Sequence, residues 1–240
     1  MKLLIDAGNT RIKWACVNGE EWLRSGVFPV EQAKELPQQF ADVHDVQQIW
    51  VSNVAGEKVA QHIRNIKVGQ PGQLHFIASR EMQCGVRNCY SNPAQLGSDR
   101  WAALVAAWHL VRRKCMVVNC GTAITIDTLS AQGQFLGGLI LPGVELMQSS
   151  LVAATNQLRA EQGKYAAFPL NTADALFSGA VQACCGAVER QYELLDDASA
   201  PVVLSGGAAG VLKKNINLPL NVVDNLVLQG LLLISQEAGA

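Results

Sequence analysis

An excess of charge of either sign is absent from this chain of 240 residues, which carries 19 Lys and Arg against 20 Asp and Glu. Without such an excess the chain has no broad attraction for nucleic acid or for an anionic membrane surface. Long apolar runs are also absent, since no segment approaches the roughly 20 residues that span a bilayer. The sequence therefore predicts a globular protein that binds neither nucleic acid nor membrane and holds any anionic ligand with local groups.

Signals for export, disulfide chemistry and zinc binding are lacking as well. Asp6 follows only a few apolar residues, so the beginning of the chain does not form the apolar core of a signal peptide. The cysteines number 7, which is odd, and no two of them form a C-x-x-C pair. We therefore expect the protein to work in a reducing compartment, the cytoplasm, without a disulfide framework or a structural zinc site.

Two segments of the chain, residues 3–15 and 116–127, share one pattern. In each, an apolar run ends at a polar residue, a turn with glycine follows, and an alternating run comes next. This pattern predicts a strand, a tight turn and a second strand. Glycine in such a turn lets a ligand come close to the backbone. The repetition predicts two halves of similar topology, residues 1–113 and 114–240, each opening with a β-hairpin.

Hydrophobic periodicity and turn residues predict the other elements. Helices are expected at residues 30–40, 57–65, 98–111, from 144 onward, at 173–195 and from 226 onward. Strands are expected at residues 48–52, 135–141 and 201–204, and a long loop at 80–95.

The helix expected at residues 98–111 is apolar around most of its surface. Trp101, Leu104, Val105 and Trp108 have the spacing of one helical face, and alanines fill much of the rest. Exposing such large side chains to water is costly, and one small domain does not cover this helix comfortably. We expect it to pack against its symmetry mate, or against another interface helix, in a two-fold dimer.

The first turn carries groups that bind phosphate. Its sequence Asp6-Ala7-Gly8-Asn9-Thr10 offers amides and a hydroxyl to phosphate oxygens and a carboxylate to Mg²⁺. Lys13 reaches the same ligand if the second strand runs back alongside the first. An ordinary hairpin turn selects the same residue types on backbone grounds alone. For this turn taken by itself, that simpler interpretation is favoured.

Two later segments change the balance. Asn119-Cys120-Gly121-Thr122 repeats the small, hydroxyl-bearing turn, and the strand at 201–204 is followed by a glycine pair that could admit an adenosine group. Two such turns facing each other would hold a polyphosphate from both sides. The chain has no G-x-x-x-x-G-K-[ST] phosphate loop, so an ATP enzyme with this sequence has to bind phosphate in another way.

The segment Gly97-Ser98-Asp99-Arg100 opens the alanine-rich helix and has two interpretations. Ser98 is the natural N-cap, and an acid in the first turn gains about 0.3–1 kcal/mol from the helix dipole without any catalytic role. Alternatively, Asp99 accepts the proton of an alcohol that attacks a phosphoryl group, and Arg100 binds an anionic substrate. The chemistry alone leaves both interpretations open.

Taken together, these motifs resemble the type III pantothenate kinases over the length of the chain. The matching elements, in order, are Asp6-x-Gly8-Asn9-Thr10-x-x-Lys13, Gly97-Ser98-Asp99-Arg100, Gly121-Thr122-Ala123-x-Thr125-x-Asp127, Gly137-Gly138-x-Ile140-x-Pro142-Gly143, and Asn171-Thr172 before Gly179. Each piece alone is unspecific, whereas the order and spacing together are highly specific. The resemblance implies an α/β fold of two similar RNase H-like halves, each a mixed sheet with flanking helices, as in the acetate and sugar kinase, Hsp70 and actin superfamily.

The resemblance also implies an activity, which is the ATP-dependent phosphorylation of pantothenate in the first step of coenzyme A synthesis, carried out by a homodimer. It implies that Asp99 is the proton acceptor. The implied ATP and phosphate contacts are Asp6, Ala7, Gly8, Asn9, Thr10, Arg11, Ile12, Lys13 and Thr122. The implied pantothenate contacts are Tyr90, Gly97, Ser98, Asp99, Arg100 and Thr172.

A monovalent cation, potassium or ammonium, is a further cofactor that the resemblance implies besides Mg²⁺. Many relatives have Asp, as a ligand of this cation, where the present chain has Asn119. Asn keeps a carbonyl oxygen but loses the negative charge, so we expect weaker cation binding here.

Two other functions are compatible with the same superfamily. A sugar kinase or polyphosphatase is disfavoured because the short chain lacks room for the usual sugar-binding insertions. A non-catalytic regulator on the same fold is the second, since relatives of the family have been described as transcriptional accessory factors. The presence of Asp6, Lys13, Asp99 and Arg100 argues against it, because a scaffold does not need that set.

Overall fold

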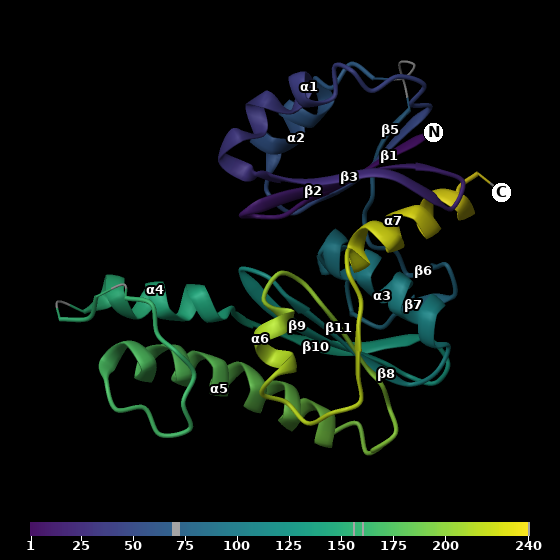
Figure 1. The fold of residues 1–240 in the computed structure, drawn as a ribbon. Helices are drawn as coiled ribbons and strands as arrows, with labels where there is room; N and C mark the ends of the chain where they lie inside the picture. Colours follow the sequence, from purple (N-terminus) through teal and green to yellow (C-terminus); the bar gives the residue numbers. More distant parts are fainter. Residues whose placement is uncertain (69–72, 156, 160, 240) are drawn as a thin grey trace. The chain divides into compact units, whose positions relative to one another are not determined.

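The computed structural model describes residues 1–68, 73–155, 157–159 and 161–239 (Figure 1). These residues form two compact units. Unit 1 draws on residues 1–110, 133–135 and 225–239, and unit 2 on residues 111–132 and 136–224. The repeat in the sequence placed residues 225–239 in the second half. In the structure these residues belong to unit 1 instead.

A five-stranded sheet in the order β3-β2-β1-β4-β5 forms the core of unit 1. β1 pairs antiparallel with β2 and parallel with β4. The strands are β1 (Lys2–Ala7), β2 (Arg11–Asn18), β3 (Glu21–Pro29), β4 (Gln48–Asn53) and β5 (Leu74–Phe76). Unit 1 also contains the 3-10 helices η1 (Val30–Glu35) and η2 (Pro93–Gln95), the helices α1 (Leu36–Gln39), α2 (Glu57–Arg64), α3 (Ser98–Val111) and α7 (Leu226–Glu237), and the short strands β6 (Met82–Gln83) and β7 (Val86–Asn88).

The second sheet has seven strands in the order β12-β11-β8-β9-β10-β7-β6, and its strands β10-β9-β8-β11-β12 repeat the order β3-β2-β1-β4-β5 of the first sheet. β8 pairs antiparallel with β9 and parallel with β11, as β1 does with β2 and β4. This repeat confirms the two similar halves that the sequence predicted. The elements are β8 (Cys115–Cys120), β9 (Ala123–Leu129), β10 (Gln134–Pro142), β11 (Val202–Ser205), β12 (Leu220–Val222), α4 (Val144–Ala154), α5 (Thr172–Glu193) and α6 (Ala209–Lys213).

Three local predictions need correction. The single helix expected at residues 30–40 is a 3-10 turn followed by the four-residue α1, with a proline in its first turn. The loop expected at residues 80–95 contains the hairpin β6–β7. Strands β3, β5 and β12 and helix α6 were not predicted.

Helix α7 packs against β1 and β4 of unit 1, which is why the end of the chain belongs there. The ammonium of Lys2 on β1 donates hydrogen bonds to the carbonyl and hydroxyl oxygens of Ser235, at 3.0 and 2.9 Å. Gly230 of α7 lies against the backbone of Ala102 on α3, where a Cβ atom would overlap the carbonyl group. In the described part of the chain, no helix has both the length and the apolar character to cross a bilayer.

The expectation that α3 packs against its symmetry mate is wrong. Every residue from Trp101 to Trp108 is buried within the single chain, and Ala106 is 1% exposed. The indole nitrogen of Trp101 donates to the side-chain oxygen of Gln83 at 3.0 Å, and α7 covers the helix at Ala102. A charge at Ala106 would therefore disrupt the fold and not only an association between chains.

We predict that Gly230→Ala lowers the free energy of unfolding by about 1–3 kcal/mol, because the new methyl group forces α7 and α3 apart. Gly186→Ala is the matched control, since Gly186 of α5 has open space where a Cβ atom would be added. That change should raise stability by about 0.5–1 kcal/mol through helix propensity. Urea denaturation of both variants measures the difference, and equal effects would contradict the close α3–α7 packing.

Candidate active site

The first hairpin places Asp6 directly opposite Lys13 on the adjacent strand. The amide of Gly8 donates to the carbonyl of Arg11 at 3.1 Å and closes the turn. Asn9, Thr10 and Arg11 are exposed, whereas Ala7 and Ile12 are buried in the core. Of the predicted phosphate contacts in this hairpin, Ala7 and Ile12 can therefore offer a ligand only their backbone.

The pKa of Asp6 also depends on the charge of Asp99, which lies at the start of α3. Burial raises the pKa of Asp6 to about 7, the negative charge of Asp99 adds to that rise, and Lys13 opposes it. Burial disfavours the charged form, and a like charge nearby disfavours it further, so the part of the rise that comes from Asp99 reflects two carboxylates in one region of unit 1. The structure thus brings together Asp6, Lys13 and Asp99, which are far apart in the sequence.

The start of α3 is fixed by backbone and hydroxyl contacts. Ser98 was expected to cap the helix, but it is the first helical residue, and its hydroxyl bonds that of Ser52 on β4 at 3.0 Å in a buried position. Ser52 pairs with Asp6 across the parallel strands β1 and β4. The hydrogen bond between the hydroxyls therefore connects Ser52, beside Asp6 in the sheet, with Ser98, the residue before Asp99.

The carboxylate of Asp99 bends back over its own backbone. Its Oδ1 atom accepts a hydrogen bond from the amide of Arg100 at 2.8 Å. A Cβ atom added to Gly97 would lie 2.7 Å from the same oxygen. Glycine at this position thus leaves room for the carboxylate, which gives a physical reason for the first residue of the Gly97-Ser98-Asp99-Arg100 segment.

Arg100 lies against two aromatic rings. Its Nη1 atom donates to the hydroxyl of Tyr90 at 3.3 Å, and its guanidinium carbon lies 5.9 Å from the ring centre of Tyr90 and 5.8 Å from that of Phe135. The two rings contact each other with centres 5.1 Å apart. Tyr90 is held in turn by Asn88, whose side-chain oxygen accepts from its amide at 3.0 Å. Sequence reasoning paired Tyr90 with Arg100 only through the family resemblance and missed Phe135, Ser52 and Asn88.

The second hairpin, in unit 2, closes in a similar way. The amide of Gly121 donates to the carbonyl of Ala123 at 3.0 Å, and Thr122 is exposed at the tip. Asn119 pairs with Ser205 of β11 and with Thr125 of β9. Two glycines approach the turn so closely that a side chain would overlap backbone: Gly143 meets Gly121 and Thr122, and Gly206, with φ of +103°, meets Cys120.

Thr172 is the first residue of α5 and is exposed. Asn171 caps the helix by accepting from the amide of Asp174 at 2.9 Å. Thr172 also lines an apolar groove of about 590 Å³ between α4 and α5, which we call the α4–α5 groove. Its other lining residues are Met147, Ser150, Leu151, Leu158, Ala175, Leu176, Gly179 and Ala180. Within the residues that the structure describes, no cluster of three or more His, Cys, Asp or Glu side chains could hold a metal ion.

Comparison with known proteins identifies the family. The sequence profile of the family described as type III pantothenate kinase matches residues 2–194. The type III pantothenate kinase of Nitrosospira multiformis is 48% identical over 238 residues, which cover 98% of this chain and 91% of that protein. The chain therefore belongs to the type III pantothenate kinase family and is a kinase.

Solved structures agree on the fold. A protein assigned to the Baf family of transcriptional activators from Campylobacter jejuni gives a TM-score of 0.62 at 24% identity, covering 99% of this chain and 98% of that one. A protein assigned as a 2-dehydro-3-deoxygalactonokinase from Sinorhizobium meliloti gives a TM-score of 0.62 at 14% identity, covering 99% and 96%. These likenesses confirm the α/β fold of two mixed sheets with flanking helices.

We predict that the carboxyl group of Asp6 titrates near pH 7 in the ligand-free protein and that Asp99→Asn lowers its pKa, because one repelling charge is removed. A raised pKa means that the folded state binds the proton more tightly than the unfolded state does. The contribution of Asp6 to stability therefore falls as the pH rises from about 4 to about 7. Carbon-13 NMR of labelled Asp6 measures this pKa, and an Asp6 that titrates near pH 4 in both proteins would contradict the prediction.

Proposed function

We propose that this chain transfers the γ-phosphoryl group of ATP to the hydroxyl of pantothenate, giving 4′-phosphopantothenate in the first step of coenzyme A synthesis in the cytoplasm. Membership of the type III pantothenate kinase family supports the reaction. The observation that carries the proposal is geometric: Asp6 lies opposite Lys13 in the pair of β1 and β2, and the hydroxyl bond from Ser52 beside Asp6 reaches Ser98, the residue before Asp99. Phosphoryl transfer needs such a set of charges, because its catalysis is largely positioning and electrostatics.

In this proposal the exposed turn of the first hairpin binds the phosphates. The amides of the turn, the hydroxyl of Thr10 and the ammonium of Lys13 offer donors to phosphate oxygens. Arg11, exposed at the start of β2, adds a second cation. Thr122, at the exposed tip of the second hairpin, offers another hydroxyl.

Mg²⁺ is expected to arrive with ATP, and the residues present fit it. A hard cation prefers carboxylate oxygens. Burial and, after it, the charge of Asp99 disfavour the ionised form of Asp6, and a positive charge nearby would favour that form again. Asp6 is therefore the residue that would hold the metal, directly or through water. When bound, Mg²⁺ neutralises the negative charge of the phosphate oxygens.

Asp99 is the proposed proton acceptor for the pantothenate hydroxyl. Gly97 leaves space beside its carboxylate, and Lys13 and Asp6 set the local charge. Arg100 and Tyr90 are the proposed partners of the pantothenate carboxylate or hydroxyls, because a guanidinium held by aromatic rings is well oriented for an anion. Gly97 and Ser98 would then contact the substrate through the backbone, since the Ser98 hydroxyl already bonds Ser52.

Binding of a monovalent cation is the part of the proposal that depends on Asn119, which stands where a site with a carboxylate would have Asp. Asn119 would be its ligand and offers a neutral carbonyl oxygen. We therefore propose that potassium or ammonium binds here more weakly than at a site with a carboxylate.

The test is ATP consumption measured with pantothenate and with a set of common sugars. We predict that turnover appears only with pantothenate. Asp99→Asn should lower this turnover roughly 10²-fold or more, because a general base is lost. Glu57→Gln is the matched control, since Glu57 is also an acid in the first turn of a helix of unit 1 and should retain full activity. Turnover with a sugar would contradict the proposed substrate, and an active Asp99→Asn would leave Asp99 with only its electrostatic role at the helix start.

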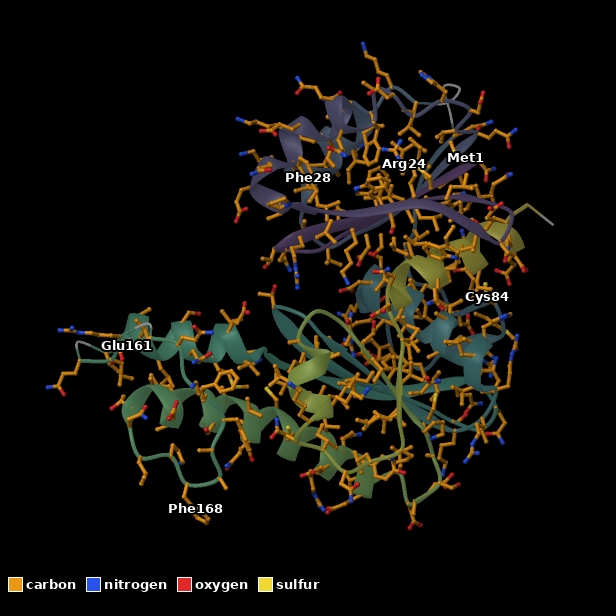
Figure 2. The ribbon with its side chains drawn as sticks, viewed as in Figure 1. Met1, Arg24, Phe28, Cys84, Glu161 and Phe168 are labelled. Atoms are coloured by element: carbon orange, nitrogen blue, oxygen red, sulfur yellow. The ribbon has the colours of Figure 1, made fainter. Side chains whose placement is uncertain are left out.

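We further propose that the protein is a homodimer formed through the α4–α5 groove. An apolar side chain of the groove itself supports this surface, since Leu151 of α4 lines the groove and is 47% exposed. In the loop that leads into α5, Phe168 is 89% exposed and Leu170 is 97% exposed, and Figure 2 shows Phe168 pointing away from the ribbon. Large exposed apolar patches mark protein interfaces. A second copy on this groove would also lie beside Thr172, the proposed pantothenate contact.

Leu151→Asp should therefore convert the dimer to a monomer and raise the KM for pantothenate, because the charge falls in the α4–α5 groove. The matched control is Leu23→Asp on β3, since Leu23 and Leu151 are 46% and 47% exposed. Sedimentation velocity gives the assembly state of each protein. A monomeric wild-type protein, or dissociation by Leu23→Asp alone, would contradict this interface.

A further inference from the structure

Tyr90, a proposed pantothenate contact, lies where β7 ends and a loop of residues 91–96 begins. The loop contains η2, and most of its residues are exposed. Gly97 follows the loop, and α3 with Asp99 in its first turn comes directly afterwards. The loop therefore connects a proposed substrate contact with the proposed proton acceptor.

Two buried polar side chains hold this loop. The side-chain nitrogen of Asn88 on β7 donates to the carbonyl of Pro93 at 3.2 Å. The hydroxyl of Ser79, which follows β5, lies 2.6 Å from the same carbonyl and 2.9 Å from that of Leu96. In the described part of the chain, every hydrogen bond from residues 91–96 to another segment ends at one of these two side chains.

Asn88 also holds Tyr90 itself. Its side-chain oxygen accepts from the amide of Tyr90 at 3.0 Å, and the preceding amide, that of Cys89, donates to the carbonyl of Phe135 at 3.2 Å. Two successive amides are thus fixed, which sets the direction in which the Tyr90 side chain leaves the backbone. Its ring then lies against that of Phe135, with centres 5.1 Å apart.

The hydroxyl of Tyr90 has a hydrogen-bond donor to offer a ligand. It accepts from Nη1 of Arg100 at 3.3 Å, and its own proton has no acceptor among the residues that the structure describes. A phenol can accept one hydrogen bond and donate another at the same time. Since Tyr90 is only partly buried, an oxygen of a bound substrate is the natural acceptor.

We propose that Asn88 is a positioning residue for the substrate: it fixes Tyr90 so that the phenol donates to an oxygen of pantothenate. This inference rests on the proposed function and adds to it a residue that itself touches no substrate. An interaction that is equally strong in the bound substrate and in the transition state affects KM and leaves kcat unchanged. Loss of Asn88 should therefore raise the KM for pantothenate and spare both kcat and the KM for ATP.

The experiment measures kcat and both KM values for the wild type and its variants. Asn88→Ala should raise the KM for pantothenate about fivefold, the effect of one weakened hydrogen bond. Asn88→Ser should recover part of this loss, because a serine oxygen also accepts from the amide two residues further on. Ser79→Ala is the matched control, since it removes a bond to the same Pro93 carbonyl but leaves the bond to the Tyr90 amide, and it should keep the wild-type KM.

A double-mutant cycle separates positioning from a general loss of stability. Tyr90→Phe removes the phenol donor, keeps the aromatic ring and should raise the same KM. If Asn88 acts through the Tyr90 hydroxyl, Asn88→Ala adds little in the Tyr90→Phe background, because coupled residues do not give additive effects. Additive effects, or an equal rise in KM for Ser79→Ala and Asn88→Ala, would overturn the inference.

Hydrogen exchange of the Tyr90 amide tests the anchoring without any substrate. In the ligand-free protein, exchange should be faster in Asn88→Ala than in the wild type and Ser79→Ala, because the amide has lost its acceptor. Equal exchange in the three proteins would overturn the inference even for an active pantothenate kinase. A wild-type protein that shows this difference in exchange but no turnover with pantothenate would contradict the proposed function and not the anchoring of Tyr90.

Discussion

Close packing of α7 on α3 is the constraint on which the proposed catalytic group depends. Gly230 lets the two helices meet at backbone distance, at Ala102, only one turn beyond Asp99. The same helix α7 is tied to β1 by the hydrogen bonds from Lys2 to Ser235, and β1 ends at Asp6 and Ala7. The end of the chain thus connects the two elements that carry the acidic side chains.

That arrangement explains why Asp6 and Asp99 interact although they are far apart in the sequence. The buried hydroxyl pair of Ser52 and Ser98 fixes the start of α3 against β4, and β4 lies beside β1 in parallel register. Two carboxylates held in one region make a place that favours positive charge. The metal ion that accompanies a nucleotide would supply such a charge, and Lys13 supplies part of it beforehand.

Much of the fold could be predicted because its signals are local. The hairpins were predicted from apolar runs that end at glycine turns, and α3 from apolar spacing over residues 98–111, the same bounds as in the structure. β3 was missed because most of its residues are exposed and show no alternation, and β5 because it has only three residues. Among the site residues, Phe135 and Ser52 gave no signal, since their importance comes from pairing between segments distant in the sequence. The mistaken interface on α3 has the same origin, because its apolar surface is covered by the helix at the other end of the chain.

The most direct test of this account is a crystal structure with pantothenate, Mg²⁺ and a non-hydrolysable ATP analogue bound. We expect the hydroxyl of pantothenate that receives the phosphoryl group to lie about 2.6–3.2 Å from a carboxylate oxygen of Asp99, the distance of a base from its proton donor. The phosphates should contact the turn between β1 and β2. A pantothenate molecule bound with that hydroxyl directed away from Asp99, or phosphates bound away from the turn, would contradict the account.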